Sequence, residues 1–369
     1  MSKKVIFLII ILFFGIFFYG MAVGTYKIFP YQYINMGNDM IFEENVDKSH
    51  KYDLLEFTSQ IGINNENDVN DKKEKIINYV WKSSEIHNSD PDLVEKNITD
   101  ERFNDLQNLE RIDRISIIMK YDVNSIVYLF HPEKSNNQLI VYHQGHSGGF
   151  INGKETIGKF LNSGYTVAAF SMPLTGMNNQ PDIEIDNVGT IRIVKHDQFS
   201  MLEEKNFSTM YYFLNPIHVT LNYIDENYNL ENYHMVGISG GGWTTTVYSA
   251  IDSRISKSFS VAGSIPLPLR VEKDNVGDYE QFNIEFYKIV NYPELYVMSS
   301  YGENREFIQI FNKFDSCCFS GTPNEKYENE VQNHILNLGN GKFQVIIDET
   351  HNEHKISDYA LERIFDIMP

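Results

Sequence analysis

The sequence predicts an α/β protein in which a mostly parallel central sheet carries helices on both faces. Two observations support this fold class. From residue 112 to the C-terminus, short apolar runs with strand character alternate with segments of helical character. One of those runs closes in the Gly-rich turn Gly237–Gly241 and leads straight into a helical segment. Alternation of this kind favours parallel strands, because each helix returns the chain to the same end of the sheet.

The expected elements can be given in chain order. Strands are predicted at 114–120, 125–130, 138–143, 165–170, 233–238, 258–262, 306–311 and 343–347. Helices are predicted at 71–82, 100–109, 154–161, 210–226, 243–251 and 357–367. We therefore divide the chain into an N-terminal apolar segment (1–24), a polar spacer with a helical extension (25–111) and the α/β domain (112–369).

Composition bounds the class of protein. The chain has 369 residues, of which 42% are hydrophobic, so it can bury a sizeable core. Its net charge of −19 argues against nucleic acid and anionic membrane surfaces as partners, because those need basic faces. The only two cysteines, Cys317 and Cys318, are adjacent. They cannot form an ordinary long-range disulfide, and we expect them to be small buried hydrophobic residues.

The N-terminus has the pattern of a membrane signal. Residues 5–24 carry no charge and follow Lys3 and Lys4. Twenty uncharged residues are long enough for a transmembrane helix, so we expect an uncleaved signal anchor. The lysines would keep the N-terminus in the cytoplasm and place the rest of the chain on the periplasmic or extracellular side. Cleavage after Ala22-Val23-Gly24, which would give a secreted protein, is the alternative.

The turn at Gly237–Gly241 carries the strongest chemical signal. It reads G-x-S-x-G, with Ser239 between a predicted strand and a predicted helix. A strand that turns this sharply lifts the serine hydroxyl above the sheet, and the positions two before and two after must then be small. We predict that Ser239 is a nucleophile. A general base, an orienting acid and oxyanion donors should lie on loops at the carboxyl ends of the other strands.

The first such loop, 143–149, reads His-Gln-Gly-His-Ser-Gly-Gly. Its glycines allow backbone N–H groups to approach a substrate closely. We predict that the amides of His146 and Gly240 form an oxyanion hole, with Gln144 or Ser147 as alternatives to His146. No metal site is expected here, because the histidines lack partners at ligand spacing.

The second loop follows the strand at 306–311 and carries Asp315. An acid there could fix the tautomer of a catalytic imidazole and stabilise its protonated form. Glu303, Glu306 and Asp348 are the rival acids.

The third loop follows the strand at 343–347 and holds two histidines, His351 and His354. We favour His354 as the general base, because it lies in the short loop that leads to the final helix, which Ser357 is expected to cap. His351 is the alternative base. H-x-x-H on a loop lacks the helical geometry of a metal motif, so no metal is expected here either.

The order Ser239, Asp315, His354 along the chain, each after a strand, makes residues 112–369 resemble an α/β-hydrolase of the esterase/lipase type. The resemblance implies a Ser-His-Asp triad with oxyanion donors at His146 and Gly240, and no cofactor. The chain departs from the common pattern in its second histidine. It also has Ser-Met-Pro at 171–173, where many members carry Asp-x-x-Gly.

Residues 174–209 occupy the position where such enzymes often carry a lid, and they include His196, Phe199 and Met201. The expected function is hydrolysis of a carboxylic ester through an acyl-enzyme, on a small ester or on acyl groups of a glycan or lipid. A peptidase or acyltransferase on the same triad, or a non-catalytic anchored binding protein, are the alternatives. The sequence assigns no substrate-binding residues.

Overall fold

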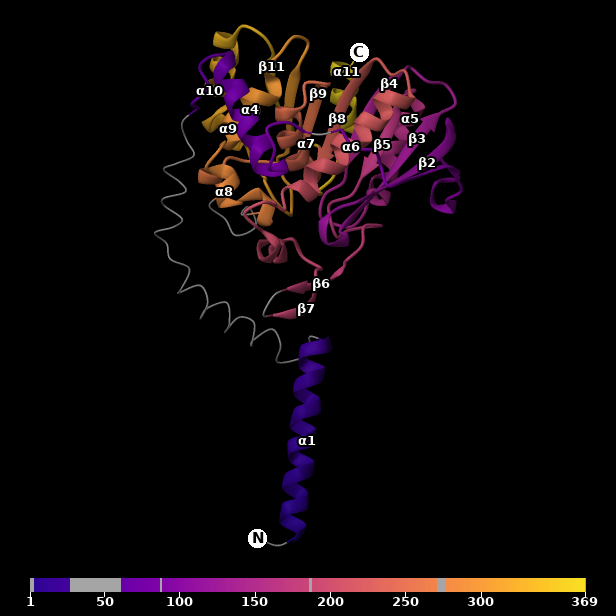
Figure 1. Ribbon diagram of the computed structural model, residues 1–369, viewed down its shortest axis with the longest axis vertical. Helices are drawn as coiled ribbons and strands as arrows, with labels where there is room; N and C mark the ends of the chain where they lie inside the picture. Colours follow the sequence, from indigo (N-terminus) through magenta and orange to yellow (C-terminus); the bar gives the residue numbers. More distant parts are fainter. Residues whose placement is uncertain (1–2, 27–60, 87, 186–187, 271–276, 369) are drawn as a thin grey trace. The chain divides into compact units, whose positions relative to one another are not determined.

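The computed structural model describes residues 3–26, 61–86, 88–185, 188–270 and 277–368. The chain divides into two compact units, Met1–Glu56 and Phe57–Pro369 (Figure 1). The described part of the first unit is a single helix, α1 (Lys3–Tyr26). In the part of the chain that the structure describes, no helix meets both the length and the apolar character needed to cross a membrane.

The second unit is built around a nine-stranded sheet with the order β1-β2-β3-β5-β4-β8-β9-β10-β11 (Figure 1). The strands from β5 to β11 in this order pair in parallel, whereas β1, β2 and β3 pair antiparallel at one edge. Their bounds are β1 Leu93–Ile98, β2 Leu109–Ile118, β3 Asn124–Pro132, β4 Gln138–His143, β5 Thr166–Phe170, β8 Asn232–Ile238, β9 Ile255–Val261, β10 Glu306–Asn312 and β11 Lys342–Asp348.

Helices cover both faces of this sheet. On one face, α5 (Lys154–Asn162) and α11 (Asp358–Ile367) bury residues such as Phe160 and Leu361 against the strands. The helices that contribute to the core on the other face are α4 Glu66–Trp81, α6 Tyr211–Asn227, α7 Gly240–Ile251, α9 Tyr292–Ser300 and α10 Glu328–Leu338, and α8 Ile284–Tyr287 packs beside them. The sheet is therefore the middle layer of three, as the alternating sequence predicts.

Polar residues are tolerated in α7, which is buried along its whole length, because the helix satisfies their hydrogen bonds itself. The hydroxyls of Thr244, Thr245 and Thr246 each donate to the carbonyl four residues earlier, at 3.0, 2.9 and 2.9 Å. All twelve residues of α7 are buried. Buried hydroxyls would otherwise destabilise the fold, so these bonds explain how a Thr-rich helix forms part of the core.

The segment after residue 61 packs on the α/β layers as part of the second unit. The α4 residue Lys72 pairs with Glu294 at 2.9 Å, and the Trp81 indole N–H donates to Asn215 Oδ1 at 2.9 Å. The predicted helix 71–82 is confirmed as the C-terminal part of α4.

Residues 174–209 form a separate excursion from the sheet. They contain a two-stranded hairpin, β6 (Asp182–Ile185) with β7 (Gly189–Arg192), and the 3-10 segment His196–Leu202. Gly176 lies close to Gly149, where an added Cβ would come within 2.7 Å of the Gly176 Cα. The excursion thus begins against the loop that follows β4.

One predicted element is wrong. Residues 100–109 form only the 3-10 turn Glu101–Phe103, and β2 already starts at Leu109. Asp100 caps this turn as it would cap a helix, but Asn108 adopts a left-handed backbone (φ 57°) and ends any continuation. Phe103 inserts into the core against Phe130, with ring centroids 5.0 Å apart. Tertiary burial of this ring, rather than a helical face, organises the segment.

Candidate active site

Ser239 stands at the tip of a sharp turn between β8 and α7. Its φ of 57° and ψ of −125° lie outside the regions that a serine normally occupies. The backbone is held there by two hydrogen bonds: the Ser239 N–H donates to the Val261 carbonyl, and the Trp243 N–H donates to the Ser239 carbonyl, both at 2.9 Å. A strained conformation that the surroundings enforce is typical of functional positions and costs roughly 1–3 kcal/mol.

The glycines of the turn are required by space. A Cβ on Gly237 would lie 2.1 Å from the Gly241 carbonyl oxygen, and one on Gly241 would lie 2.0 Å from the His143 carbonyl oxygen. A Cβ on Gly145 would lie 2.6 Å from the Ser239 Cβ. The small residues expected around a raised serine are therefore present, and the loop after β4 passes directly against Ser239.

Asp315 and His354 are brought together by the loops after β10 and β11. The two loops are cross-linked, since the Ser316 N–H donates to the Asn352 carbonyl at 3.2 Å. His354 Nδ1 lies 2.7 Å from Asp315 Oδ2, and His354 Nε2 is buried without a hydrogen-bond partner. Because a carboxylate only accepts, Nδ1 carries the proton, which leaves a lone pair on Nε2.

The charge state of Asp315 suits this pairing. Burial alone would raise the pKa of its carboxyl group. The bond from His354 and the backbone N–H groups of Cys317 (2.8 Å) and Cys318 (3.4 Å) outweigh burial and hold the pKa below its usual value. Asp315 is thus ionised at neutral pH and can accept the His354 Nδ1–H.

His351 is engaged differently. Its Nδ1 accepts from the Glu353 N–H at 3.1 Å, so the ring proton is on Nε2. That nitrogen lies 3.2 Å from Asp348 Oδ2, although without hydrogen-bond geometry. Asp348 itself accepts from the Thr350 N–H at 2.8 Å and from the Ser357 hydroxyl, so it braces the start of α11. Neither nitrogen of His351 offers a free lone pair.

The Ser239 hydroxyl is not hydrogen-bonded to either histidine, since neither His354 Nε2 nor His351 Nε2 has a partner. Such bonds are often long or absent without substrate and tighten in the reacting complex. The rival acid Glu306 sits at the far end of β10, where it pairs with Lys342 at 2.7 Å and Lys257 at 3.4 Å. Glu303 forms part of a turn before that strand and is exposed.

The two predicted oxyanion residues lie next to each other. Gly240 is the first residue of α7, and a Cβ added to it would come within 2.4 Å of the His146 ring. His143, in contrast, is buried and its Nδ1 contacts the Gln144 carbonyl at 2.9 Å. Burial lowers the pKa of His143 to about 4, so this ring is neutral and structural.

The expectation that the two cysteines are small buried hydrophobic residues is wrong. Cys317 and Cys318 form a disulfide with each other, and Cys317 is exposed. Asp315 Oδ1 accepts from both backbone N–H groups, which folds the loop into a tight turn and brings the two sulfur atoms together. The sulfur atoms also lie within 4.8 Å of a His354 ring nitrogen, so the disulfide borders the acid–base pair.

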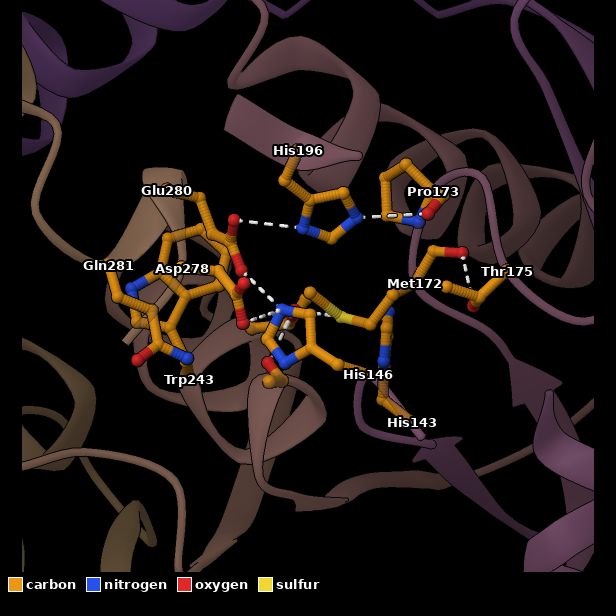
Figure 2. Close-up of polar contacts among 12 residues, drawn as sticks. His143, His146, Met172, Pro173, Thr175, His196, Trp243, Asp278, Glu280 and Gln281 are labelled. Carbon is orange, nitrogen blue, oxygen red and sulfur yellow. Dashed lines mark hydrogen bonds and ion pairs between the residues drawn. The ribbon is translucent and has the colours of Figure 1, made fainter. Parts of the chain in front are cut away.

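Sequence reasoning missed a buried group on the other side of Ser239. Glu280 is fully buried and contacts both His146, at 2.7 Å, and His196, at 3.0 Å (Figure 2). His196 was noted only as part of the excursion. Glu280 lies in a connection between β9 and α8 that carries no motif, so no local signal could have identified it.

A cavity of about 610 Å³ opens between α4 and the excursion, lined by residues that include Tyr79, Glu203 and Tyr279. The three predicted triad residues do not line it.

No family model and no curated protein sequence matches this chain. Solved structures do resemble it. Acetyl xylan esterase 1 from Thermoanaerobacterium sp. JW/SL YS485 aligns with a TM-score of 0.55 at 14% identity over 86% of this chain and 98% of its own. The acetyl xylan esterase from Paenibacillus sp. R4 aligns with 0.56 at 14% identity over 85% and 96%.

The glucuronoyl esterase from Solibacter usitatus aligns with a TM-score of 0.53 at 11% identity, over 80% of this chain and 90% of its own. Likeness at such low identity concerns the fold and not the activity. Together with the parallel sheet, the raised serine and the strand order, it shows that this chain has the α/β-hydrolase fold.

Proposed function

We propose that the protein hydrolyses a carboxylic ester through an acyl-enzyme formed on Ser239. The observation that carries this proposal is the state of His354. Its Nδ1–H is fixed by Asp315, and its Nε2 is a buried base without a partner, on a loop at the same end of the sheet as Ser239. His351 has no equivalent free nitrogen, which supports the choice of His354.

In the first half-reaction, Ser239 Oγ attacks the ester carbonyl while His354 Nε2 removes its proton. Asp315 stabilises the imidazolium that forms. The amides of Gly240 and His146 donate to the oxyanion of the tetrahedral intermediate. His354 then protonates the leaving alcohol, and Ser239 remains acylated.

In the second half-reaction, His354 removes a proton from water, which attacks the acyl carbonyl. The tetrahedral intermediate collapses to the free acid, and the proton returns to Ser239. Metals and cofactors have no part in these steps, because the serine and the histidine supply the nucleophile and the base.

We infer that the substrate is an ester on a glycan or lipid, or a small exogenous ester. The structural neighbours named above are esterases whose names refer to acetylated xylan and to glucuronoyl groups. They support a glycan-linked ester as the first class to test, although the identities are too low to transfer the acyl group.

We also propose that residues 5–24 act as a signal anchor, with the α/β-hydrolase domain on the periplasmic or extracellular side. This proposal rests on the uncharged sequence behind Lys3 and Lys4. The disulfide between Cys317 and Cys318 agrees with an oxidising compartment. Membrane fractionation with mass analysis of the N-terminus would test it. Retention with residues 1–24 intact is expected, and a soluble chain that begins near residue 25 would indicate a cleaved signal instead.

The activity is tested with the full-length protein and p-nitrophenyl acetate and butyrate, beside Ser239→Ala. We expect measurable turnover in the wild type and a loss of at least about 10³-fold in the variant. A folded wild type without turnover on these esters or on acetylated oligosaccharides would contradict the proposal. Cleavage of peptides instead of esters would favour a peptidase, and transfer to an added alcohol in preference to water would favour an acyltransferase. A folded protein with no hydrolysis and no acyl transfer would favour a non-catalytic binding protein.

A further inference from the structure

Three segments that are distant in the sequence meet beside Gly240. His146 comes from the loop after β4, His196 from the excursion, and Glu280 from the 3-10 segment Tyr279–Gln281. Figure 2 shows both imidazoles pointing toward the Glu280 carboxylate, with Asp278 next to it. His146 Nε2 lies 2.7 Å from Glu280 Oε1 and 3.1 Å from Asp278 Oδ2, and His196 Nδ1 lies 3.0 Å from Glu280 Oε2.

Both ring nitrogens of His196 face acceptors. Its Nε2 lies 2.9 Å from the Pro173 carbonyl oxygen, which can only accept, so Nε2 carries a proton. In a neutral ring, Nδ1 would then present its lone pair to the Glu280 carboxylate. Two acceptors at 3.0 Å repel each other, so a positive occupant must lie between them, either a second ring proton or a bound cation.

His146 repeats this imbalance. Its Nε2 faces two carboxylates, Glu280 and Asp278, and a single N–H proton can form a well-aligned bond to only one of them. Glu280 is also fully buried, which is costly for a carboxylate unless positive charge surrounds it. If both rings are neutral, the two histidines carry too few N–H protons to hydrogen-bond all the carboxylate oxygens that they face.

We propose that His146, His196, Glu280 and Asp278 bind a divalent transition-metal ion of the zinc type. Two imidazoles and two carboxylates are a ligand set that zinc accepts in tetrahedral geometry. The ligand atoms of His146, His196 and Glu280 already lie within 4.8 Å of one another. Metal bonds of about 2.0–2.1 Å place tetrahedral ligands roughly 3.3 Å apart, so the contacts at 2.7, 3.0 and 3.1 Å would open by roughly 0.2–0.6 Å.

Two further features fit a metal centre. His196 donates its Nε2–H to a backbone carbonyl, as metal-bound histidines do to fix their orientation. The Asp278 side chain is 51% exposed and that of His146 is 24% exposed, so an ion can enter from this side. The ion would fasten the excursion to the loop that carries His146, and it takes no part in the ester chemistry. This inference does not depend on the proposed function, because binding is measured without substrate.

The test uses the full-length protein stripped with a chelator and titrated with Zn²⁺ against a chromophoric competitor. We expect one ion per chain, a rise in Tm with added Zn²⁺, and visible absorption typical of a tetrahedral site when Co²⁺ replaces it. Glu280→Gln should weaken Zn²⁺ binding by at least about 100-fold, and His196→Gln similarly. Glu306→Gln is the matched control. It alters a buried carboxylate at the start of β10, where Glu306 pairs with Lys342, and should retain wild-type binding of Zn²⁺.

The folded wild type decides the matter even if the variants are unstable. Failure of the stripped wild type to bind Zn²⁺ or Co²⁺ would overturn the proposal and assign both His196 nitrogens a proton. Binding that persists unchanged in folded Glu280→Gln would place the ion elsewhere, for example at a reduced Cys317, Cys318 and His354, and would overturn it as well.

Discussion

Two histidines that lie three residues apart on the loop after β11 each face an aspartate, yet their ring nitrogens differ in protonation. The Nδ1–H of His354 donates a hydrogen bond to Asp315, and a buried lone pair remains on Nε2. His351 accepts a backbone N–H at Nδ1 and turns its protonated Nε2 toward Asp348. The same residue types therefore leave a free ring nitrogen in one pair and none in the other. The hydrogen-bond partners of each ring set its tautomer, and the tautomer is what makes His354 rather than His351 our proposed base.

The largest expected difference is between the effects on kcat of replacing the two aspartates. Asp315→Asn removes the acceptor that fixes the His354 tautomer, so kcat should fall by about 10³–10⁴-fold. Asp348→Asn weakens the bonds to Thr350 and Ser357 and should lower the free energy of unfolding by about 1–3 kcal/mol, with kcat kept within tenfold. Ester turnover and urea unfolding measured on both variants would show this. The reverse pattern would mean that Asp348 is the catalytic acid.

Access to Ser239 provides a second comparison. A Cβ at Gly145 meets the Ser239 Cβ at 2.6 Å and the Ile238 carbonyl oxygen at 2.9 Å, so Gly145→Ala must displace the loop from the serine. We expect kcat/KM to fall by about 100-fold. Gly158→Ala is the control, because its Cβ would meet only the end of the Leu106 side chain, at 3.1 Å, in helix α5. Equal activity of both variants would show that the loop does not shape the site.

Removing the disulfide should change kcat only slightly, although the disulfide borders the Asp315–His354 pair. Asp315 receives backbone N–H groups from Cys317 and Cys318, and these remain in a Cys317→Ser/Cys318→Ser variant. We expect kcat to change by less than about tenfold, equivalent to roughly 1.4 kcal/mol. Turnover of the variant and of the wild type treated with dithiothreitol gives the answer. A loss as large as that of Asp315→Asn would show that the disulfide itself holds the acid in place.

The smallest expected effect is on stability at acid pH. The pKa of Asp315 is lowered in the folded state, so its pairing adds stability above the unfolded-state value near 4 and loses it as the pH falls through the lower folded value. Between pH 7 and 5 wild type should exceed Asp315→Asn by a constant margin of about 1–3 kcal/mol, which shrinks below pH 4. Urea unfolding across this range measures it. A margin that stays constant down to pH 2 would mean that the carboxylate is not responsible.

Much of this site could be predicted because its parts are local in the sequence. Ser239, Asp315 and His354 each follow a strand, and parallel strands end at the same edge of a sheet. Helix α9 was missed although its signal was present, an Asn291 cap with Glu294 three residues on and Pro293 at the helix start.

Other features had no local signal. Glu280 meets His146 and His196 only through folding of two long insertions, and a partner 84 to 134 residues away leaves no spacing to read. The helix expected at 100–109 failed because burial of Phe103 overrides a weak periodicity. The choice between His351 and His354 required the hydrogen bonds of both rings, which sequence position does not determine.

The most direct measurement is the rate at which a fluorophosphonate modifies Ser239, followed by intact mass in wild type, His354→Ala and His351→Ala. With His354 as the base, modification should slow by at least about 10³-fold in His354→Ala and stay within about threefold of wild type in His351→Ala. Peptide mapping should place the adduct on Ser239. Slow modification in His351→Ala with a normal rate in His354→Ala, or an adduct on another residue, would contradict the account.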